Sequence, residues 1–471
     1  MHIVDYFVIA GYFALVMYLG YYSMKKVSNF DDYAVAGRSM PLPIFFAAIA
    51  ATLCGGGATI GRISFMHTTG IIVFFALTGV VINQIFSGLF ISGRVHNAGK
   101  NVYSLGDLYG IYYGRSGRLL SSVFGFLFCV GAFGVQILAM GAILQTATGI
   151  SLIPAALIAS IVTLAYTWSG GILAVTLTDA VQYVIIVIGV TLCAYLAIDH
   201  LGGFDAMMSI LYSNPRFETN MKPLANWSLG LFFSFLLGEF CAPYYIQRYA
   251  STKSAKDSKN GLLIFGVHWI FFMATTAAIG LASMAIQPDV KPDLAFTNLI
   301  RDILPPGITG LVFGALLAAV MSTGAAMINT SAVIYTRDIY NKFINTAATQ
   351  AQLLRQSRLS TLVVGGISIG VAIIFQDVFG LMIYMFKLWP SAILPPLMCG
   401  LLWGKISPYA GAPAVIAGGL SFFLWSDKVL GEPFGIPANF IGIGMNCLVL
   451  FFVHQKMKGH KPEGPFLPDL N

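Results

Sequence analysis

The sequence predicts an all-α polytopic membrane protein, and three observations lead to this class. Hydrophobic residues make up 57% of the 471 positions and charged residues only 10%, whereas a soluble domain carries about 25% charged residues. The mean hydropathy is +0.79. Apolar runs follow one another along the chain, each with the ~20 residues that a helix needs to cross ~30 Å of hydrocarbon. This composition leaves no room for a large soluble domain.

Thirteen such runs are present, and we expect each to form a transmembrane helix. No cleavable signal peptide, linker or second domain is visible, so we expect one transmembrane domain over residues 1–471. An odd number of spans places the two termini on opposite sides of the membrane. The approximate limits are 4–23, 42–68, 70–93, 119–148, 151–168, 171–198, 227–250, 260–286, 307–336, 359–376, 379–403, 409–425 and 436–454.

The basic residues predict the orientation. If the N-terminus is outside, 19 of the 26 Lys and Arg residues fall in inside segments and five in outside segments, while Arg62 and Lys387 lie within spans. Because cytoplasmic loops carry an excess of Lys and Arg, we expect a cytoplasmic C-terminus in a plasma membrane, namely a bacterial inner membrane. The net charge of +7 then reflects topology and not nucleic-acid binding. The longest inside loop, near 337–358, could form an amphipathic segment at the membrane surface.

The second span contains a glycine-rich stretch, Cys54 to Arg62, with four glycines within seven residues. Glycine costs about 1 kcal/mol relative to alanine inside a helix, so this helix can break. Broken backbone at bilayer depth is tolerated where it lines a cavity or is buried in protein, and its free carbonyl groups can bind a cation. The alternative is that these glycines only let a neighbouring helix approach closely.

The ninth span carries two adjacent hydroxyl groups at mid-membrane, Ser322 and Thr323. Hydroxyl and carbonyl oxygens without a carboxylate suit a weakly held monovalent cation, because a Ca²⁺ site more often recruits Asp or Glu. The alternative is that both hydroxyls bond to carbonyl groups one turn earlier in their own helix.

The sequence resembles the sodium/solute symporter family in three motifs. These are Ala318-Ala319-Val320-Met321-Ser322-Thr323, the run of Tyr-Thr, Gly-Gly, Thr-Asp and Gln within residues 166–182, and Gln247-Arg248 before a Lys-rich loop. The resemblance implies the LeuT-type five-plus-five inverted-repeat fold. The first repeat would span 42–198 and the second 227–403, with an extra helix at 4–23 and two more within 409–454. That fold breaks the first helix of each repeat, and Gly238 to Pro243 is a suitable second break because proline lacks an N–H group.

The resemblance also implies a sodium site made of five oxygens. Its members would be the carbonyl groups of Gly57, Ile60 and Ala319 and the hydroxyl groups of Ser322 and Thr323. A second sodium site of some relatives needs two serines where this chain has alanines at 325 and 326, so we expect one sodium ion.

Asp179 would lie below the sodium ion on its exit path to the cytoplasm. The alternative is a structural carboxylate held by a nearby hydroxyl or arginine.

Arg62 departs from the family, in which small residues are usual at this position. An arginine at mid-membrane costs at least ~2.5 kcal/mol and calls for a partner. Three alternatives stay open: Arg62 binds a solute carboxylate, pairs with Glu239, or reaches the interface. Lys387 is a second cation within a span. Two cations and one glutamate favour a carboxylate-bearing anion as the solute. Further candidates follow: Ser64 and Gln136 for solute contact, and Tyr244 and Tyr245 as gates.

We therefore expect a sodium-coupled symporter that works by alternating access. Its partners would be Na⁺, a small organic solute and the lipid bilayer, with no nucleic acid and no obligate protein partner. The alternatives are a proton-coupled or sodium-independent transporter of the same fold, or a membrane solute sensor. No His-Glu-x-x-His, serine nucleophile elbow or P-loop occurs, so we do not expect an enzyme.

Overall fold

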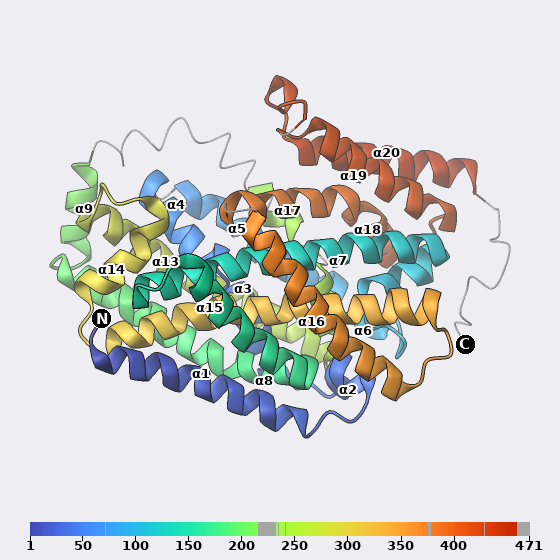
Figure 1. The fold of residues 1–471 in the computed structure, drawn as a ribbon. Coiled ribbons are helices and arrows are strands. Elements are labelled where there is room, and N and C mark those ends of the chain that lie inside the picture. The colour runs from blue at the N-terminus through green and yellow to red at the C-terminus, as the bar shows by residue number, and fades with distance from the viewer. Residues whose placement is uncertain are drawn as a thin grey trace.

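The structure is a computed structural model whose described part is helical. It contains one isolated β-bridge, between Met40 and Thr252. Figure 1 shows helices gathered along one long direction, with α1 starting at one end of the bundle and α20 finishing at the other. The described residues are 1–70, 72–214, 232–233, 235–240, 242–374, 378–427 and 429–458.

The helices of the first half include three of the π or 3₁₀ type, labelled η. In chain order they are α1 (Ile3–Met24), α2 (Phe30–Val35), η1 (Ala36–Arg38), α3 (Leu42–Leu53), η2 (Gly57–Gly61), α4 (Arg62–Thr69), α5 (Ile72–Phe86), η3 (Ser87–Ile91), α6 (Ser92–Asn97), α7 (Leu105–Thr148), α8 (Leu152–His200) and α9 (Phe204–Tyr212).

The second half also consists of long helices with short η segments between them. In chain order they are α12 (Pro243–Ser251), α13 (Ala255–Ile286), η4 (Pro292–Leu294), α14 (Ala295–Ile303), α15 (Ile308–Ile334), η5 (Tyr335–Ile344), α16 (Gln350–Ile374), α17 (Val378–Ala392), α18 (Leu394–Leu402), η6 (Pro408–Ala410), α19 (Gly411–Trp425), η7 (Pro433–Gly435) and α20 (Ala438–Lys456).

The polytopic class is confirmed, but the count of thirteen spans stays a prediction. Among the described residues, nine helices are long and apolar enough to cross a membrane, or up to eleven if two bent pairs each count as one span. One difference from the prediction is α8, which joins the predicted spans 151–168 and 171–198. Its 49 residues would measure ~70 Å if straight, and Gly171 interrupts it with φ +54°. The predicted span 227–250 lies partly outside the described residues.

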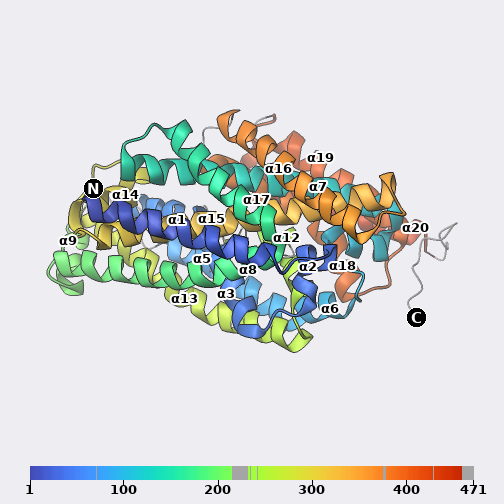
Figure 2. The same ribbon diagram turned by 60° about the horizontal axis from the view of Figure 1, so that its bottom comes forward.

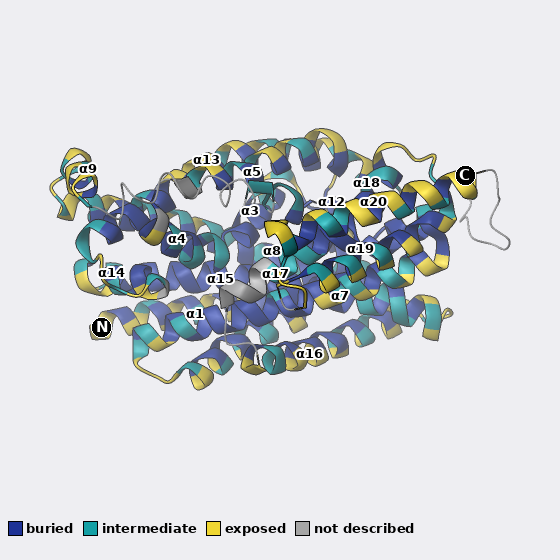
Figure 3. Ribbon diagram, turned by 90° about the horizontal axis from the view of Figure 1, so that it is seen from above, coloured by how far each residue is buried: buried dark blue, intermediate teal, exposed yellow. Residues whose placement is uncertain are grey.

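The central helix is α15, and every residue from Val312 to Ile334 is buried. Small residues let its neighbours approach closely. On α8, for example, a Cβ atom at Gly189 would lie only 2.5 Å from Ala315 Cβ. Figure 2 shows α1 lying along α8. In Figure 3 the exposed residues lie on outer helices such as α13 and α16, where Val267 and Val363 present apolar side chains outward, as a lipid-facing surface requires.

The predicted break in the second span is confirmed. The α-helix α3 stops at Leu53, the chain forms the π-helix η2, and α4 starts at Arg62. The two halves are bent by 62°.

The second predicted break is also present in the described residues. Residues 235–238 are helical, Glu239 and Phe240 form a turn, and α12 begins at Pro243. Side chains satisfy the carbonyl groups that the break releases: Trp389 Nε1 donates to the Phe240 carbonyl at 3.1 Å. Such satisfaction is what allows a broken helix at membrane depth.

Candidate ion and solute site

The hydroxyl pair of α15 lies against the end of α3. Ser322 Oγ donates to the Ala51 carbonyl at 2.8 Å and is also 2.8 Å from the Ala319 carbonyl. Thr323 Oγ1 donates to the Thr52 carbonyl at 2.6 Å and lies 3.1 Å from the same Ala319 carbonyl. Each hydroxyl therefore bonds within its own helix and across to the broken helix, and five neutral oxygens converge.

Glycine is required at the break because the neighbouring helices touch its backbone. A Cβ atom at Gly55 would lie 2.3 Å from Thr323 Oγ1, and one at Gly56 would lie 3.0 Å from Ala139 Cβ. The Gly56 N–H donates to Gln136 Oε1 at 3.1 Å. The glycine run thus serves both alternatives at once, since it breaks the helix and admits close neighbours.

Three of the predicted sodium ligands, Ala319, Ser322 and Thr323, share one turn of α15. A fourth, Gly57, lines the same cavity as Thr323. Ile60 lies outside that lining. The carbonyl groups that the hydroxyls actually contact belong to Ala51 and Thr52, which the sequence reasoning missed because register at a break depends on tertiary packing. The ligand roles of Gly57 and Ile60 stay predictions.

Asp179 is buried next to this oxygen cluster. Arg248 Nη2 donates to Asp179 Oδ2 at 2.6 Å, and Thr52 Oγ1 lies 3.5 Å from the same oxygen. The carboxylate is therefore held by an arginine and a hydroxyl, as the structural alternative expected. Thr52 connects the two features, since its carbonyl group contacts Thr323 while its hydroxyl contacts Asp179. The exit-path role of Asp179 stays a prediction.

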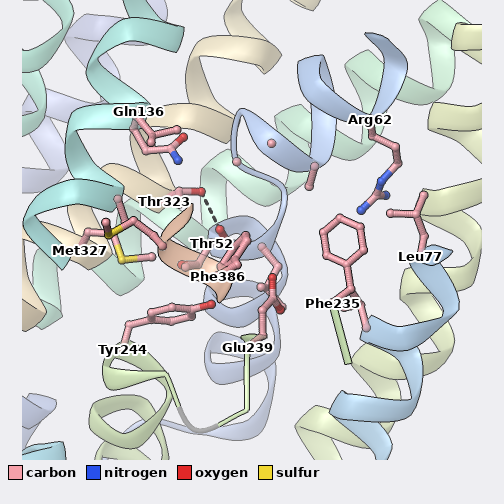
Figure 4. Close-up of a pocket in the computed structure, with 18 of the residues that line it drawn as sticks. Thr52, Arg62, Leu77, Gln136, Phe235, Glu239, Tyr244, Thr323, Met327 and Phe386 are labelled. Carbon is pink, nitrogen blue, oxygen red and sulfur yellow. Dashed lines mark hydrogen bonds between the residues drawn. The ribbon is translucent and has the colours of Figure 1, made fainter. Parts of the chain in front are cut away.

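A cavity of about 70 Å³ opens beside Thr323, between the two broken helices (Figure 4). Most of its lining is apolar, with a small number of polar groups, which is the usual character of a small-molecule site. The polar lining residues are Thr52, Arg62, Gln136, Glu239, Tyr244 and Thr323.

Arg62 enters this cavity from the first turn of α4 with its side chain buried, at 4% exposure. Its guanidinium lies over the Trp269 ring at 4.7 Å and over Phe272 at 5.9 Å, and Nη1 is 3.4 Å from Thr276 Oγ1. Within the described residues no carboxylate lies within 4.0 Å of it. Arg62 therefore neither pairs with Glu239 nor reaches the interface in this structure.

The residues that hold Arg62 were missed by the sequence reasoning, although a signal existed. Trp269, Phe272 and Thr276 are spaced by three and four positions on α13, so they share one helix face. An aromatic pair followed by a hydroxyl on one face is a suitable support for a guanidinium.

Glu239 faces the cavity from the turn of the second break. Its Oε2 accepts a hydrogen bond from the Tyr245 hydroxyl at 3.2 Å, and that hydroxyl accepts one from Gln84 Nε2 at 2.7 Å. No Lys or Arg nitrogen of the described residues lies within 4.0 Å of Glu239. In Figure 4 the Phe235 ring lies between Arg62 and Glu239.

One of the predicted solute residues needs correction. Lys387 pairs with Glu432, at 3.1 Å between Nζ and Oε1, and is absent from the cavity lining. The partner stands in the loop between α19 and α20, which a count of charges within spans overlooks. Ser64 lies outside the lining, and its contact with a solute stays a prediction.

The two predicted gate tyrosines are neighbours in the structure. Tyr244 lines the cavity, and the Tyr245 ring packs against the Tyr244 ring with centroids 4.5 Å apart. Their gating role stays a prediction.

Comparison with known proteins shows which proteins this chain is similar to. The family model described as "Sodium:solute symporter family" matches residues 33–418. The osmoregulated proline transporter OpuE of Bacillus subtilis is 25% identical over 443 residues, which covers 90% of this chain and 89% of that protein. The sodium/proline symporter of Escherichia coli is 25% identical over 427 residues, covering 87% and 85%. A sodium/glucose cotransporter of Vibrio parahaemolyticus is 24% identical over 460 residues, covering 88% and 83%.

Solved structures share the fold. A Na⁺-coupled sialic acid symporter in a substrate-bound outward-open state superposes with a TM-score of 0.83 at 19% identity, covering 97% of this chain and 98% of that one. The nucleobase-cation symporter Mhp1 in a closed conformation has a TM-score of 0.59 at 14% identity, covering 93% and 96%. These neighbours have the LeuT-type fold, so the predicted fold class is confirmed.

Proposed function

We propose that this chain, which belongs to the sodium:solute symporter family, couples sodium entry to the entry of a small zwitterionic solute by alternating access. The protein is a multi-pass transporter of the plasma membrane and not an enzyme. One observation supports the choice of solute. Arg62 and Glu239 line the same cavity with opposite charges, and within the described residues neither forms an ion pair within 4.0 Å.

The charge balance of the cavity favours a zwitterion over the anion expected from the sequence. That expectation counted Lys387 among the cavity cations, and Lys387 pairs with Glu432 instead. One cation and one anion remain. A buried charge without a partner costs several kcal/mol. A solute that carries only a negative charge would pair with Arg62 but leave Glu239 without a partner.

A solute with both charges satisfies both cavity residues. Its carboxylate would pair with Arg62, its N–H groups would donate to Glu239, and its apolar body would pack on Phe235 and Leu77, which also line the cavity. The relatives named as proline transporters are consistent with such a solute.

Sodium would bind where α15 meets the break. We place it among the carbonyl groups of Gly57, Ile60 and Ala319 and the hydroxyls of Ser322 and Thr323. An ion there would hold η2 against α15, and η2 is followed directly by Arg62. Fixing the break therefore fixes the carboxylate-binding group, so each ligand raises the affinity for the other. The membrane potential adds ~2.3 kcal/mol per charge per 100 mV to inward movement.

We infer the orientation from the basic residues, with the N-terminus outside and the C-terminus cytoplasmic. Sodium would then leave past Asp179 into a sodium-poor cytoplasm. Alkylation of single cysteines introduced at positions 100 and 291 by a membrane-impermeant maleimide tests this. Labelling of intact cells at 291 and not at 100 is expected, and the reverse pattern would contradict the inference.

A matched set of ligands tests the zwitterion. Purified protein is titrated with L-proline, which carries both charges, with pyrrolidine, which carries only the ammonium, and with cyclopentanecarboxylate, which carries only the carboxylate. A panel of the other α-amino acids runs beside them, because the preferred side chain is a separate matter. We expect one or more zwitterions to bind in a sodium-dependent manner. The analogues of the best zwitterion that lack its amino or its carboxyl group should bind about 30-fold or more weakly. Equal binding of a singly charged analogue, or binding of no zwitterion, would contradict the proposal.

A further inference from the structure

A second, larger cleft lies at the end of the bundle that carries the loop between α6 and α7. Its volume is about 750 Å³. It is bounded by that loop, by the first turns of α7, by η5 and by the start of α16. It includes the basic loop near 337–358 that the sequence analysis placed at the membrane surface, and it plays no part in the transport site described above.

The π-helix η5 presents polar groups to this cleft. Residues four and five positions apart share a face of a π-helix, and Arg337, Asn341 and Lys342 all line the cleft. On the loop between α6 and α7, Lys100 also lines the cleft. π-Helices are rare and, as single-turn bulges, are found frequently at functional sites, and this one spans ten residues.

The charges around the cleft are unequal. Four cations line it, namely Lys100, Arg118, Arg337 and Lys342. Two buried carboxylates, Asp107 and Asp338, are shared by the arginines: Arg118 Nη1 lies 2.5 Å from Asp107 and 3.2 Å from Asp338, and Arg337 Nε lies 3.4 Å from Asp107.

The two lysines, unlike the two arginines, form no ion pair with a carboxylate of the described residues. Lys100 and Lys342 are exposed, and within the described residues neither has a carboxylate within 4.0 Å. The cleft therefore carries an excess of positive charge, and its two lysines are exposed to solvent.

The donors point to a phosphate group as the ligand. Lysine and arginine at one site bind phosphate oxygens through charge-assisted hydrogen bonds, and the amide side chains of Asn97, Asn101 and Gln350 add further donors to the lining. Basic pockets at the cytoplasmic surface of membrane proteins bind anionic headgroups. Next to the cleft, Ile344 exposes 63% of its surface, as a residue facing the lipid interface would.

We propose that this cleft binds a phosphate-bearing anion, either an anionic lipid headgroup or a free phosphate compound, between Lys100 on the α6–α7 loop and Lys342 on η5. The ligand would join two segments that are far apart in the sequence. Because η5 continues α15, the helix of Ser322 and Thr323, the bound anion would hold the end of the central transport helix.

The test uses detergent-purified full-length protein at constant sodium concentration, with melting temperature and titrated affinity as readouts. One arm adds potassium pyrophosphate against potassium chloride of equal ionic strength. The other adds dihexanoyl-phosphatidylglycerol against dihexanoyl-phosphatidylcholine. Lys100→Gln combined with Lys342→Gln removes the two lysines, and Lys253→Gln combined with Lys256→Gln removes two equally exposed lysines outside the cleft.

We expect at least one anionic probe to raise the melting temperature above its control. We also expect the cleft double variant to bind that probe about tenfold more weakly, with the control variant unchanged. Binding of phosphatidylglycerol alone identifies a lipid headgroup, and binding of pyrophosphate identifies a free phosphate compound. The proposal is overturned if neither probe acts, or if the two double variants bind alike. Sodium-coupled uptake by the variants is measured separately and does not bear on this result.

Discussion

Replacing Arg62 with glutamine separates a solute-binding arginine from a structural one. The guanidinium is buried, lies over Trp269, and has no carboxylate partner within the described residues. If it binds the solute carboxylate, losing one member of a buried charge pair costs about 2–5 kcal/mol. Glutamine keeps one N–H donor, so we take about 2–3 kcal/mol, which corresponds to a ~30- to 150-fold loss of affinity.

The stability of the solute-free protein responds differently to the same substitution. Arg62→Gln removes a cation–π contact worth ~0.5–2 kcal/mol, but it also removes a buried charge that has no partner, which is unfavourable by itself. The two effects oppose each other, so we expect the free energy of unfolding to stay within about 1 kcal/mol of the native value.

The assay is equilibrium binding of the best zwitterion to purified protein, with thermal melting of the solute-free protein beside it. Lys387→Gln is the matched control, because it removes the other cation within a predicted span, one that lies outside the cavity lining and whose ion pair is 27% and 25% exposed. A pair of this exposure contributes about 0–1 kcal/mol, and we expect unchanged solute affinity. An Arg62→Gln protein that melts normally and binds within about threefold of the native protein would refute the reasoning.

Three further substitutions test the same site. Thr323→Val should raise the sodium concentration for half-maximal binding by about tenfold, because one charge-stabilising oxygen is lost. Thr309→Val on the same helix is the control and should leave this concentration unchanged. Equal effects of the two substitutions would contradict the role assigned to Thr323. Gly55→Ala places a Cβ atom 2.3 Å from Thr323 Oγ1, whereas the Cβ atom of Gly314→Ala meets no atom within 4 Å. Gly55→Ala should therefore destabilise the protein by about 1–3 kcal/mol and lower uptake, whereas Gly314→Ala should be tolerated. Thermal melting and uptake assays measure both effects. Glu239→Gln should weaken zwitterion binding by about 30-fold while sparing a des-amino analogue, and an equal loss for both ligands would argue against an ammonium contact.

The sequence was sufficient for features that local chemistry determines. Four glycines from Gly55 to Gly61 predicted a break because a helix pays for each of them in backbone entropy, and the break is present. Ser322 and Thr323 predicted an oxygen cluster at mid-membrane, and their hydroxyls reach the broken helix. Gly238 to Pro243 predicted the second break for the same kind of local reason.

Features that depend on distant packing were not predictable in the same way. The carbonyl groups that meet the hydroxyls belong to Ala51 and Thr52, several residues before the glycine run, because register is set by how α3 packs on α15. Lys387 finds its carboxylate 45 positions later in the chain, in a loop whose course the sequence does not specify. Both features depend on contacts between segments that are far apart in the sequence, which local patterns do not specify.

Solute uptake into proteoliposomes with and without a sodium gradient tests the central claim most directly. The claim is that one sodium ion at the junction of α15 and the broken helix prepares the cavity for the solute. We predict that uptake of the best zwitterion requires an inward sodium gradient, saturates with a Hill coefficient near 1 as one ion implies, and loses sodium affinity in Thr323→Val. Uptake that continues at the same rate when potassium or choline replaces sodium would contradict the account.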